Sequence, residues 1–295
     1  MDVNKNSYTI IFSVIMATVV ALLLSVLYMC VKPKQDKNIE QEKKQNILKS
    51  IGKKVDRATA ENIYSKFIIK ELVVKTNGEI VNQYRTSFLD SVSKGLNLDL
   101  SETQIDKINK ERAFSIDIAK ELKKDGSDQL LPLYIAKLEG EIKYIIPLRG
   151  KGLWGPVWGF IALESDANTI SAAVFDHKSE TPGLGAEINK PIFQDQFPKK
   201  NIYDLSINKV MFEVVKKGTK QGNYEVDGIG GGTITSDGVS NMIKERFTKY
   251  FNYLLGNHNI QNSDQLEENE SNNEIEENYL LNDNYSNTLP PSFAI

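Results

Sequence analysis

The longest apolar stretch of the chain lies near its N-terminus. Residues 7–31 contain no charged side chain. A helix needs roughly 20 apolar residues to cross the hydrocarbon core of a bilayer, so this stretch predicts a single transmembrane helix. A cleaved signal peptide has an apolar core of about 7–15 residues and a small-residue cleavage site. This stretch ends instead in Tyr-Met-Cys-Val-Lys-Pro. We therefore expect residues 1–31 to be an N-terminal tail and a retained membrane anchor.

Beyond residue 31 the pattern becomes polar with helical spacing. Apolar side chains recur among charged ones, first at Ile39, Ile47 and Leu48 and then within residues 56–69. This spacing predicts a helical stalk over residues 32–69.

Short β-rich runs separated by turns follow the stalk. Asn77-Gly78 and Glu139-Gly140 each stand between two such runs, which predicts two hairpins. Further β-rich runs cover residues 157–163, 169–175 and 209–215. Residues 90–128 are charged and helix-prone, and we expect them to be the most variable or mobile insertion. Helical spacing returns over residues 237–255, with Gly256 as a stop.

These elements predict an α+β fold class. We expect a single N-terminal transmembrane helix followed by a mixed α+β domain, residues 70–256, of short strands closed by a C-terminal helix. Residues 257–295 are rich in Asn, Glu and Ser and lack the apolar density to fold alone. We expect them to form an acidic, disordered tail.

Composition excludes several classes of function. The 295 residues carry a formal net charge of -3, which gives no reason to expect a nucleic-acid partner. A single cysteine, Cys30, rules out an intrachain disulfide. Together with only two histidines, it makes a zinc site or a Cys–His nucleophile a poor interpretation.

A glycine-rich stretch, residues 227–236, leads directly into the last predicted helix. It reads Asp227-Gly-Ile-Gly-Gly-Gly-Thr-Ile-Thr-Ser236. Glycines allow a bulky group to approach the backbone, and a helix beginning near Ser236 or Asp237 would present free N–H groups to a phosphate near Thr233. An ordinary turn, with Thr235 or Ser236 as the helix N-cap, explains the same residues.

Two other stretches combine glycine with groups that suit a flat ligand. Residues 177–185 form a tight Pro-Gly-Leu-Gly loop that includes His177, a candidate proton donor. Residues 150–159 hold both tryptophans of the chain, whose rings could wall a planar ring system. An ordinary turn explains the first stretch equally well, and a buried aromatic cluster explains the second.

The three stretches together resemble one family, the C subunit of sodium-translocating NADH:quinone reductases, with the related G subunit of Rnf electron-transport complexes. Gly152 to Gly155 match its Gly-Leu-Trp-Gly motif, and Glu180 to Gly185 match its Glu-Thr-Pro-Gly-Leu-Gly motif. Residues 227–236 are similar to its flavinylation motif, Asp-Gly-x-Ser/Thr-Gly-Ala-Thr-x-Thr-Ser. Gly230 and Gly232 are departures, standing where Ser or Thr and Ala are usual.

The resemblance implies a covalent FMN, joined through a phosphoester to the hydroxyl of Thr233. A flavin transferase would form the bond from FAD with a magnesium ion. The resemblance implies no catalytic residue and no metal site in this chain. It implies ring and phosphate contacts from Leu153, Trp154, Glu180, Thr181, Gly183, Leu184, Gly185, Gly231, Gly232, Ile234 and Thr235.

The resemblance also implies partners and a location. The partners would be the other membrane subunits of the reductase and the lipid bilayer, and the location a bacterial inner membrane with the flavin domain on the periplasmic side. Lysine placement argues the other way, because Lys32, Lys34 and Lys37 outnumber Lys5 across the apolar stretch. We follow the longer motif match. An Rnf-type subunit and a flavin-free membrane scaffold remain alternatives.

Overall fold

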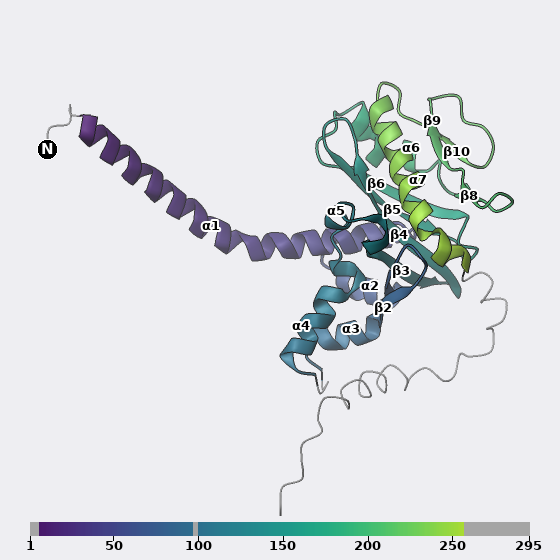
Figure 1. Cartoon of the computed structure of the whole chain (residues 1–295), viewed down its shortest axis with the longest axis horizontal. Coiled ribbons are helices and arrows are strands. Elements are labelled where there is room, and N and C mark those ends of the chain that lie inside the picture. Colours follow the sequence, from purple (N-terminus) through teal and green to yellow (C-terminus); the bar gives the residue numbers. More distant parts are fainter. Residues whose placement is uncertain (1–5, 97–99, 257–295) are drawn as a thin grey trace, which may run out of the picture.

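The structure, a computed structural model, describes residues 6–96 and 100–256. The predicted tail therefore lies outside the described residues. Helix α1 (Asn6–Lys49) joins the predicted anchor and stalk in one continuous helix. Figure 1 shows that α1 stands away from the rest of the molecule and bends before it reaches the domain, and Pro33 lies inside the helix.

Helix α1 is the one helix of the described chain that is long and apolar enough to cross a membrane. Its most apolar window has a mean hydropathy of 2.9, and none of it is buried. The chain is therefore anchored by its N-terminal part.

The far end of α1 belongs to the folded domain. Ile47, Leu48 and Ile51 are buried against Tyr64 and Ile68. Within the predicted stalk, residues 32–69, the chain is helical to Lys49 and again in α2 (Ala60–Phe67), and it enters a strand at Ile68.

The domain is built on a six-stranded antiparallel sheet in the order β2-β1-β3-β4-β5-β6. Its strands are β1 (Ile68–Val74), β2 (Ile80–Arg85), β3 (Leu131–Leu138), β4 (Glu141–Lys151), β5 (Pro156–Leu163) and β6 (Ile170–His177). Both predicted hairpins are present, as the pairs β1–β2 and β3–β4.

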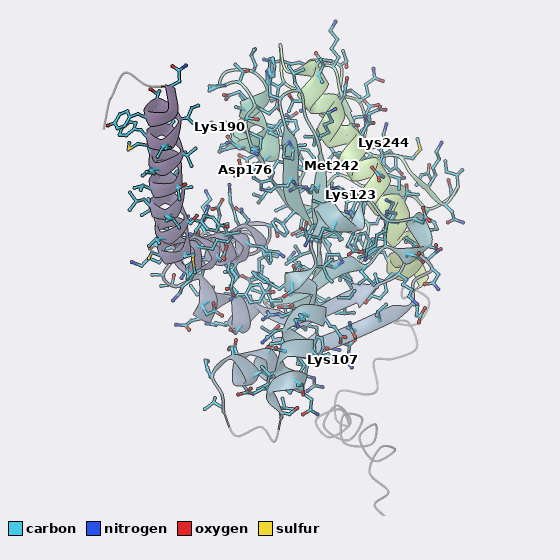
Figure 2. The ribbon with its side chains drawn as sticks, turned by 60° about the vertical axis from the view of Figure 1, so that its left-hand side comes forward. Lys107, Lys123, Asp176, Lys190, Met242 and Lys244 are labelled. Atoms are coloured by element: carbon cyan, nitrogen blue, oxygen red, sulfur yellow. The ribbon has the colours of Figure 1, made fainter. Side chains whose placement is uncertain are left out.

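Each face of the sheet is covered. One face packs against α7 (Thr233–Gly256), whose Met242 is buried, while Lys244 turns outward and pairs with Glu213 (Figure 2). The other face packs against the end of α1 and α2. Side chains of β5 alternate accordingly, with Val157 facing α7 and Phe160 facing α1.

The segment predicted to be a helix-prone insertion is a group of short helices beside β1. They are α3 (Thr86–Ser93), α4 (Glu102–Glu111), the 3-10 turn η1 (Ala113–Ser115), α5 (Ile118–Glu121) and η2 (Gly126–Asp128). Glu71, which is fully buried on β1, holds this group through Arg112 and accepts a hydrogen bond from Tyr64 at 3.0 Å. Removing one member of a buried ion pair typically costs about 3–5 kcal/mol.

Short elements connect the sheet to α7. They are η3 (Gly185–Asn189), α6 (Pro191–Gln194), β7 (Tyr203–Asp204), β8 (Lys209–Val210), β9 (Glu213–Val215) and β10 (Glu225–Asp227). The run predicted over residues 209–215 is divided, because β8 pairs with β7 whereas β9 pairs with β10. Strand β10 ends at Asp227, where the glycine-rich loop begins.

Candidate functional site

Three loops meet at the N-terminal end of α7. The first is the turn between β4 and β5, which carries Leu153 and Trp154. The second follows β6 and contains Glu180. The third is the glycine-rich loop between β10 and α7. The motifs that the sequence singled out therefore converge on one surface.

Glu180 links the first loop to α7. Its carboxylate accepts a hydrogen bond from the Trp154 main-chain N–H at 2.9 Å and another from the Thr235 hydroxyl at 2.5 Å. Glu180 and Thr235 are both buried, with 5% and 1% of their surface exposed. The two side chains therefore connect the first and second loops to α7 through buried hydrogen bonds, and they do not face the solvent.

The Glu180 carboxylate stays ionised in this position. Burial acts to raise its pKa, but hydrogen bonds from Thr235 and from the N–H groups of Trp154, Leu153 and Gly155 outweigh burial and lower the pKa. A charged acceptor makes each of these hydrogen bonds stronger than a neutral one.

Glycines are needed where the loops touch this carboxylate. A Cβ atom on Gly152 would lie 2.6 Å from Glu180 Oε1, and one on Gly185 would lie 2.3 Å from Thr235 Oγ1. Both distances are too short for any other residue to fit without movement.

The second loop is a compact turn. The Thr181 carbonyl accepts hydrogen bonds from the N–H groups of Leu184 and Ala186, each at 3.1 Å. Gly183 has a φ of +77° and donates its N–H to Glu187 at 2.9 Å. His177 accepts the Glu180 N–H on its Nδ1 at 3.2 Å, so the structure shows it bracing this turn.

The third loop contacts the second one closely. Gly231 has a φ of +76°, and a Cβ there would lie 2.7 Å from Leu184 Cδ2. A Cβ on Gly232 would lie 3.2 Å from the Gly185 nitrogen. The two loops therefore form a continuous backbone surface.

Helix α7 begins at Thr233, three residues before the predicted start at Ser236. Thr235 and Ser236 are thus in its first turn, and the prediction that either one is the N-cap is wrong. Ser236 instead accepts the Ile229 N–H on its hydroxyl at 2.9 Å, which closes the glycine-rich loop. Long-range contacts, rather than local propensity, fix this helix start.

Thr233 occupies the first position of α7 and is exposed. Within residues 6–96 and 100–256, its hydroxyl has no hydrogen-bond partner. The N–H groups of a helix's first turn lack partners inside the helix and present a positive dipole end. A phosphoryl group on Thr233 would lie beside them.

Large apolar side chains of the three loops and of the first turn of α7 are exposed. Leu153 is 47% exposed, Trp154 65%, Leu184 43% and Ile234 56%. These four exposed apolar side chains, on the first two loops and the first turn of α7, are the kind of surface that a planar ring system would cover.

The two tryptophans do not share this site. Trp158 is on β5, paired with Arg149, and lines a pocket between the sheet and α1. The interpretation that both indole rings wall one ligand is therefore wrong for Trp158, because it shares the face of β5 that carries Phe160 and packs toward α1, whereas Trp154 is in the turn before β5.

Sequence reasoning gave no role to two charged residues near the third loop. The Asp227 carboxylate accepts N–H groups from Gly218, Thr219 and Lys220 at 2.7–3.2 Å, which anchors that turn. A Cβ on Gly230 would lie 3.7 Å from Lys217 Nζ, so the Lys217 ammonium is beside the loop. These contacts come from residues 7–13 positions away, and no motif signals them.

Comparisons with known proteins agree with this geometry. A family model described as "FMN-binding domain" matches residues 152–247, which include all three loops. The chain is 28% identical over 251 residues to the C subunit of the Na(+)-translocating NADH-quinone reductase of Haemophilus ducreyi, covering 83% of this chain and 91% of the relative. For the same protein of Vibrio parahaemolyticus the identity is 30%, covering 76% and 84%.

Solved structures give the same result. The crystal structure of the Parabacteroides distasonis member, again the C subunit of a Na(+)-translocating NADH-quinone reductase, superposes with a TM-score of 0.62 at 36% identity, covering 76% of this chain and 96% of that one. The Shewanella oneidensis protein NqrC superposes with a TM-score of 0.52 at 23% identity, which shows a shared fold.

Proposed function

For this chain, which belongs to the C-subunit family of the Na(+)-translocating NADH-quinone reductases, we propose that FMN is joined to the hydroxyl of Thr233 by a phosphoester bond. The chain is a membrane-anchored, FMN-carrying subunit of that oxidoreductase. What we propose beyond this is the identity of the attachment residue, Thr233, and the contacts around it.

The observation that carries the proposal is the environment of Thr233. It combines an exposed hydroxyl without a partner among the described residues, the N-terminus of a 24-residue helix, and a glycine-rich loop directly before that helix. The neighbouring Thr235 differs, because its hydroxyl is buried and bonded to Glu180. Of these two threonines, Thr233 alone is available for modification.

The phosphoryl group would be held by the chain's own polar groups. The N–H groups at the start of α7 directly follow the glycine loop, and the Lys217 ammonium lies beside that loop, 3.7 Å from the position of a Cβ on Gly230. Together they compensate negative charge without requiring a metal ion.

The ring system would be held by Leu153, Trp154, Leu184 and Ile234. Their exposed surface is apolar, and Gly183, where nothing lies within 4 Å of an added Cβ, leaves its backbone open to a flat group. When bound, FMN supplies reversible electron transfer. The chain fixes its position and its surroundings, so the carrier does not dissociate between partners.

We further propose that a flavin transferase attaches the group and that the flavin domain lies on the periplasmic side of the membrane. The exposure of Thr233 supports access by such an enzyme. The lysines at 32, 34 and 37 favour the opposite side, so the location is tested separately, by labelling Cys substitutions in intact cells.

Flavin fluorescence of the denatured chain tests the attachment. We would co-express the full chain with a flavin transferase and separate it on a denaturing gel. The wild-type band should fluoresce, and Thr233→Val should abolish the signal. Thr219→Val, which changes an exposed threonine of the adjacent turn, should retain it. A fluorescent Thr233→Val band would overturn the assignment, and dark bands throughout would favour a flavin-free scaffold.

A further inference from the structure

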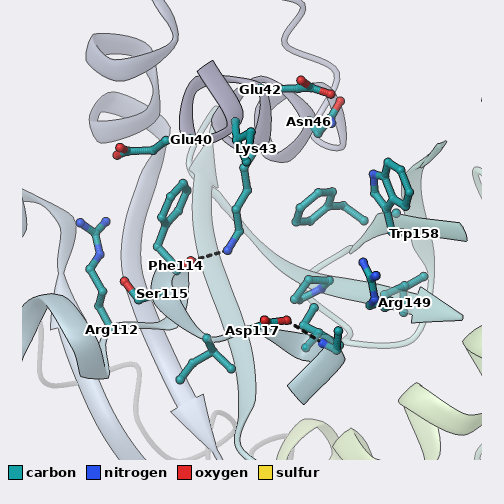
Figure 3. A pocket seen from close by; sticks show the side chains of 18 of the residues that line it. Glu40, Glu42, Lys43, Asn46, Arg112, Phe114, Ser115, Asp117, Arg149 and Trp158 are labelled. Atoms are coloured by element: carbon teal, nitrogen blue, oxygen red, sulfur yellow. Dashed lines mark hydrogen bonds between the residues drawn. The ribbon is translucent and has the colours of Figure 1, made fainter. Parts of the chain in front are cut away.

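A cavity lies on the opposite face of the sheet from Thr233. It has a volume of about 1040 Å³ and opens between α1, the segment around η1 and α5, and strands β4 and β5. Figure 3 shows Lys43 reaching into it from α1, with Arg149 and Trp158 on the opposite wall. The volume is of the size that proteins use for organic ligands.

The acidic residues that line this cavity are already paired. Asp36 pairs with Lys32 at 2.5 Å, Glu40 with Lys44 at 2.9 Å, and Glu42 with Arg57 at 3.7 Å. Asp117 accepts the Ala119 N–H at 2.9 Å, at the start of α5. These contacts do not remove the negative charge, and both Glu40 and Asp117 still attract the Lys43 ammonium.

Two of the three lining cations lack a carboxylate partner. Arg112 is paired with Glu71. Lys43 donates to the Phe114 carbonyl, and its ammonium lies 4.3 Å from the centre of the Phe114 ring. Among the residues that the structure describes, neither Lys43 nor Arg149 forms a salt bridge. An anion could therefore pair with Lys43 and Arg149 without displacing a carboxylate from either side chain.

Burial is the main influence on the pKa of Lys43. Burial lowers the pKa of this ammonium to about 8, and the attraction of Glu71, Asp117 and Glu40 does not offset burial and the repulsion of Arg112. An anion in the cavity would stabilise the protonated form.

The remaining walls suit an apolar or planar body. Trp158 and Phe160 project from β5, and Ile39 of α1 is 56% exposed at the same cavity. Aromatic and aliphatic walls with a cationic end fit an amphiphilic anion.

The position of the cavity along α1 indicates where that anion comes from. The apolar stretch ends at residue 31, and Asp36 lines the cavity five residues later, about 7.5 Å along a helix. The polar layer on each side of a bilayer is about 5–8 Å thick. Because α1 bends after its apolar part, its second half does not lead straight away from the membrane (Figure 1). Trp158 is also of a residue type that is enriched at membrane surfaces.

We propose that this cavity binds the phosphate of an acidic phospholipid, with Lys43 and Arg149 holding the anion and Trp158, Phe160 and Ile39 contacting its apolar part. Soluble organic phosphates present the same anion, so the experiment separates the two sources. The site is independent of FMN attachment.

Native mass spectrometry of the full chain in detergent tests the proposal. Phosphatidylglycerol should remain bound, and phosphatidylcholine should not. Arg149→Gln and Lys43→Gln should each weaken binding about fivefold or more, because each removes a charge-assisted contact. Lys37→Gln, which removes an exposed charge of α1 outside the cavity, should leave binding unchanged. Circular dichroism melting would establish that each variant is folded.

Binding should also weaken between about pH 7 and pH 9, as the Lys43 ammonium is lost. The other charged groups that face Lys43 are Glu40, Glu71, Asp117, Arg112 and Arg149. Carboxylates and guanidinium groups do not ordinarily titrate in that interval. The pH dependence should therefore disappear in Lys43→Gln, a result that a merely structural role would not give.

The other outcomes are equally decisive. Glycerol 1-phosphate binding as tightly as phosphatidylglycerol would assign the cavity to a soluble phosphate and overturn the lipid source. Equal binding of the two lipids, or an equal loss in Lys37→Gln, would overturn the site itself.

Discussion

The Thr235 hydroxyl donates a hydrogen bond of 2.5 Å to the Glu180 carboxylate, across 55 positions of the chain. This contact joins the loop after β6 to the first turn of α7. The same carboxylate accepts the Trp154 N–H from the β4–β5 turn. A single buried charge thus sets the relative position of all three loops around Thr233.

Replacing this carboxylate should destabilise the chain. Glu180→Gln puts an N–H₂ group where the donors of Thr235 and Trp154 converge, and hydrogen bonds to a charged group typically contribute about 1.5–3 kcal/mol. We expect a loss of this size in the free energy of unfolding, measured by denaturant titration. Glu187 accepts only one N–H group, that of Gly183, and the amide oxygen in Glu187→Gln can still accept it, so this variant should cost less. Equal losses would contradict the central role of Glu180.

Acid should lower the stability of the folded chain by protonating the Glu180 carboxylate. The pKa of Glu180 in the folded chain is below its usual value of 4.5, so its stabilising effect is present above that pH and is lost as the pH falls through the folded-state pKa. The lowered pKa of Asp227 acts in the same direction. We expect the melting temperature to fall between about pH 5 and pH 3, and to fall less in Glu180→Gln. An unchanged pH profile in the variant would show that Glu180 is not responsible.

Restoring the usual motif residues at positions 230 and 232 should leave FMN attachment intact, just as the glycines present there should allow it. A Cβ on Gly230 meets only the flexible Lys217 side chain, at 3.2 Å, and one on Gly232 meets its neighbours at 3.1–3.2 Å. We expect Gly230→Ser and Gly232→Ala to keep FMN attachment, with stability changes below about 1 kcal/mol.

Gly231→Ala is the matched comparison, since Gly231 has a φ of +76°. It should cost about 1–2 kcal/mol and reduce the fraction of chain that carries FMN. The attached fraction is read from the mass of each purified variant. Loss of attachment in Gly232→Ala together with retention in Gly231→Ala would contradict this explanation of the loop.

The two tryptophans should behave differently toward the flavin. Trp154 is beside the proposed ring site, whereas Trp158 lines the cavity on the opposite face of the sheet. Trp154→Ala should raise flavin fluorescence, because a neighbouring indole ring quenches it, and should change stability little, since the side chain is 65% exposed. Trp158→Phe should leave the fluorescence unchanged. A change of flavin fluorescence in Trp158→Phe and none in Trp154→Ala would place the flavin ring on the face of the sheet that packs against α1.

The hairpins and the anchor could be predicted because their signals are local. Asn77-Gly78 forms the expected turn, with the Glu79 N–H donating to Asn77 Oδ1 at 3.0 Å and Gly78 at a φ of +90°. The apolar stretch indicated the anchor by its length alone. The motifs also indicated the three loops, although not the direction of their side chains.

The remaining features depend on contacts between distant segments. The start of α7 was missed because Thr-Ile-Thr after three glycines has weak helical propensity, and its first turn is fixed by Glu180 and by the Ile229 N–H. The separation of Trp158 from Trp154 was missed because both faces of the sheet are apolar at β5, so hydrophobic pattern does not distinguish them. The end of α1 looked like a free stalk because the sheet that buries Ile47 comes later in the sequence.

The most direct measurement is the intact mass of the full chain after co-expression with a flavin transferase, beside Thr233→Ala. We expect a gain of one FMN moiety in the wild type, mapped by fragmentation to the peptide that contains Thr233, and no gain in the variant. A gain in Thr233→Ala, or no gain in either chain with the transferase shown to be active on another substrate, would contradict covalent attachment at this residue.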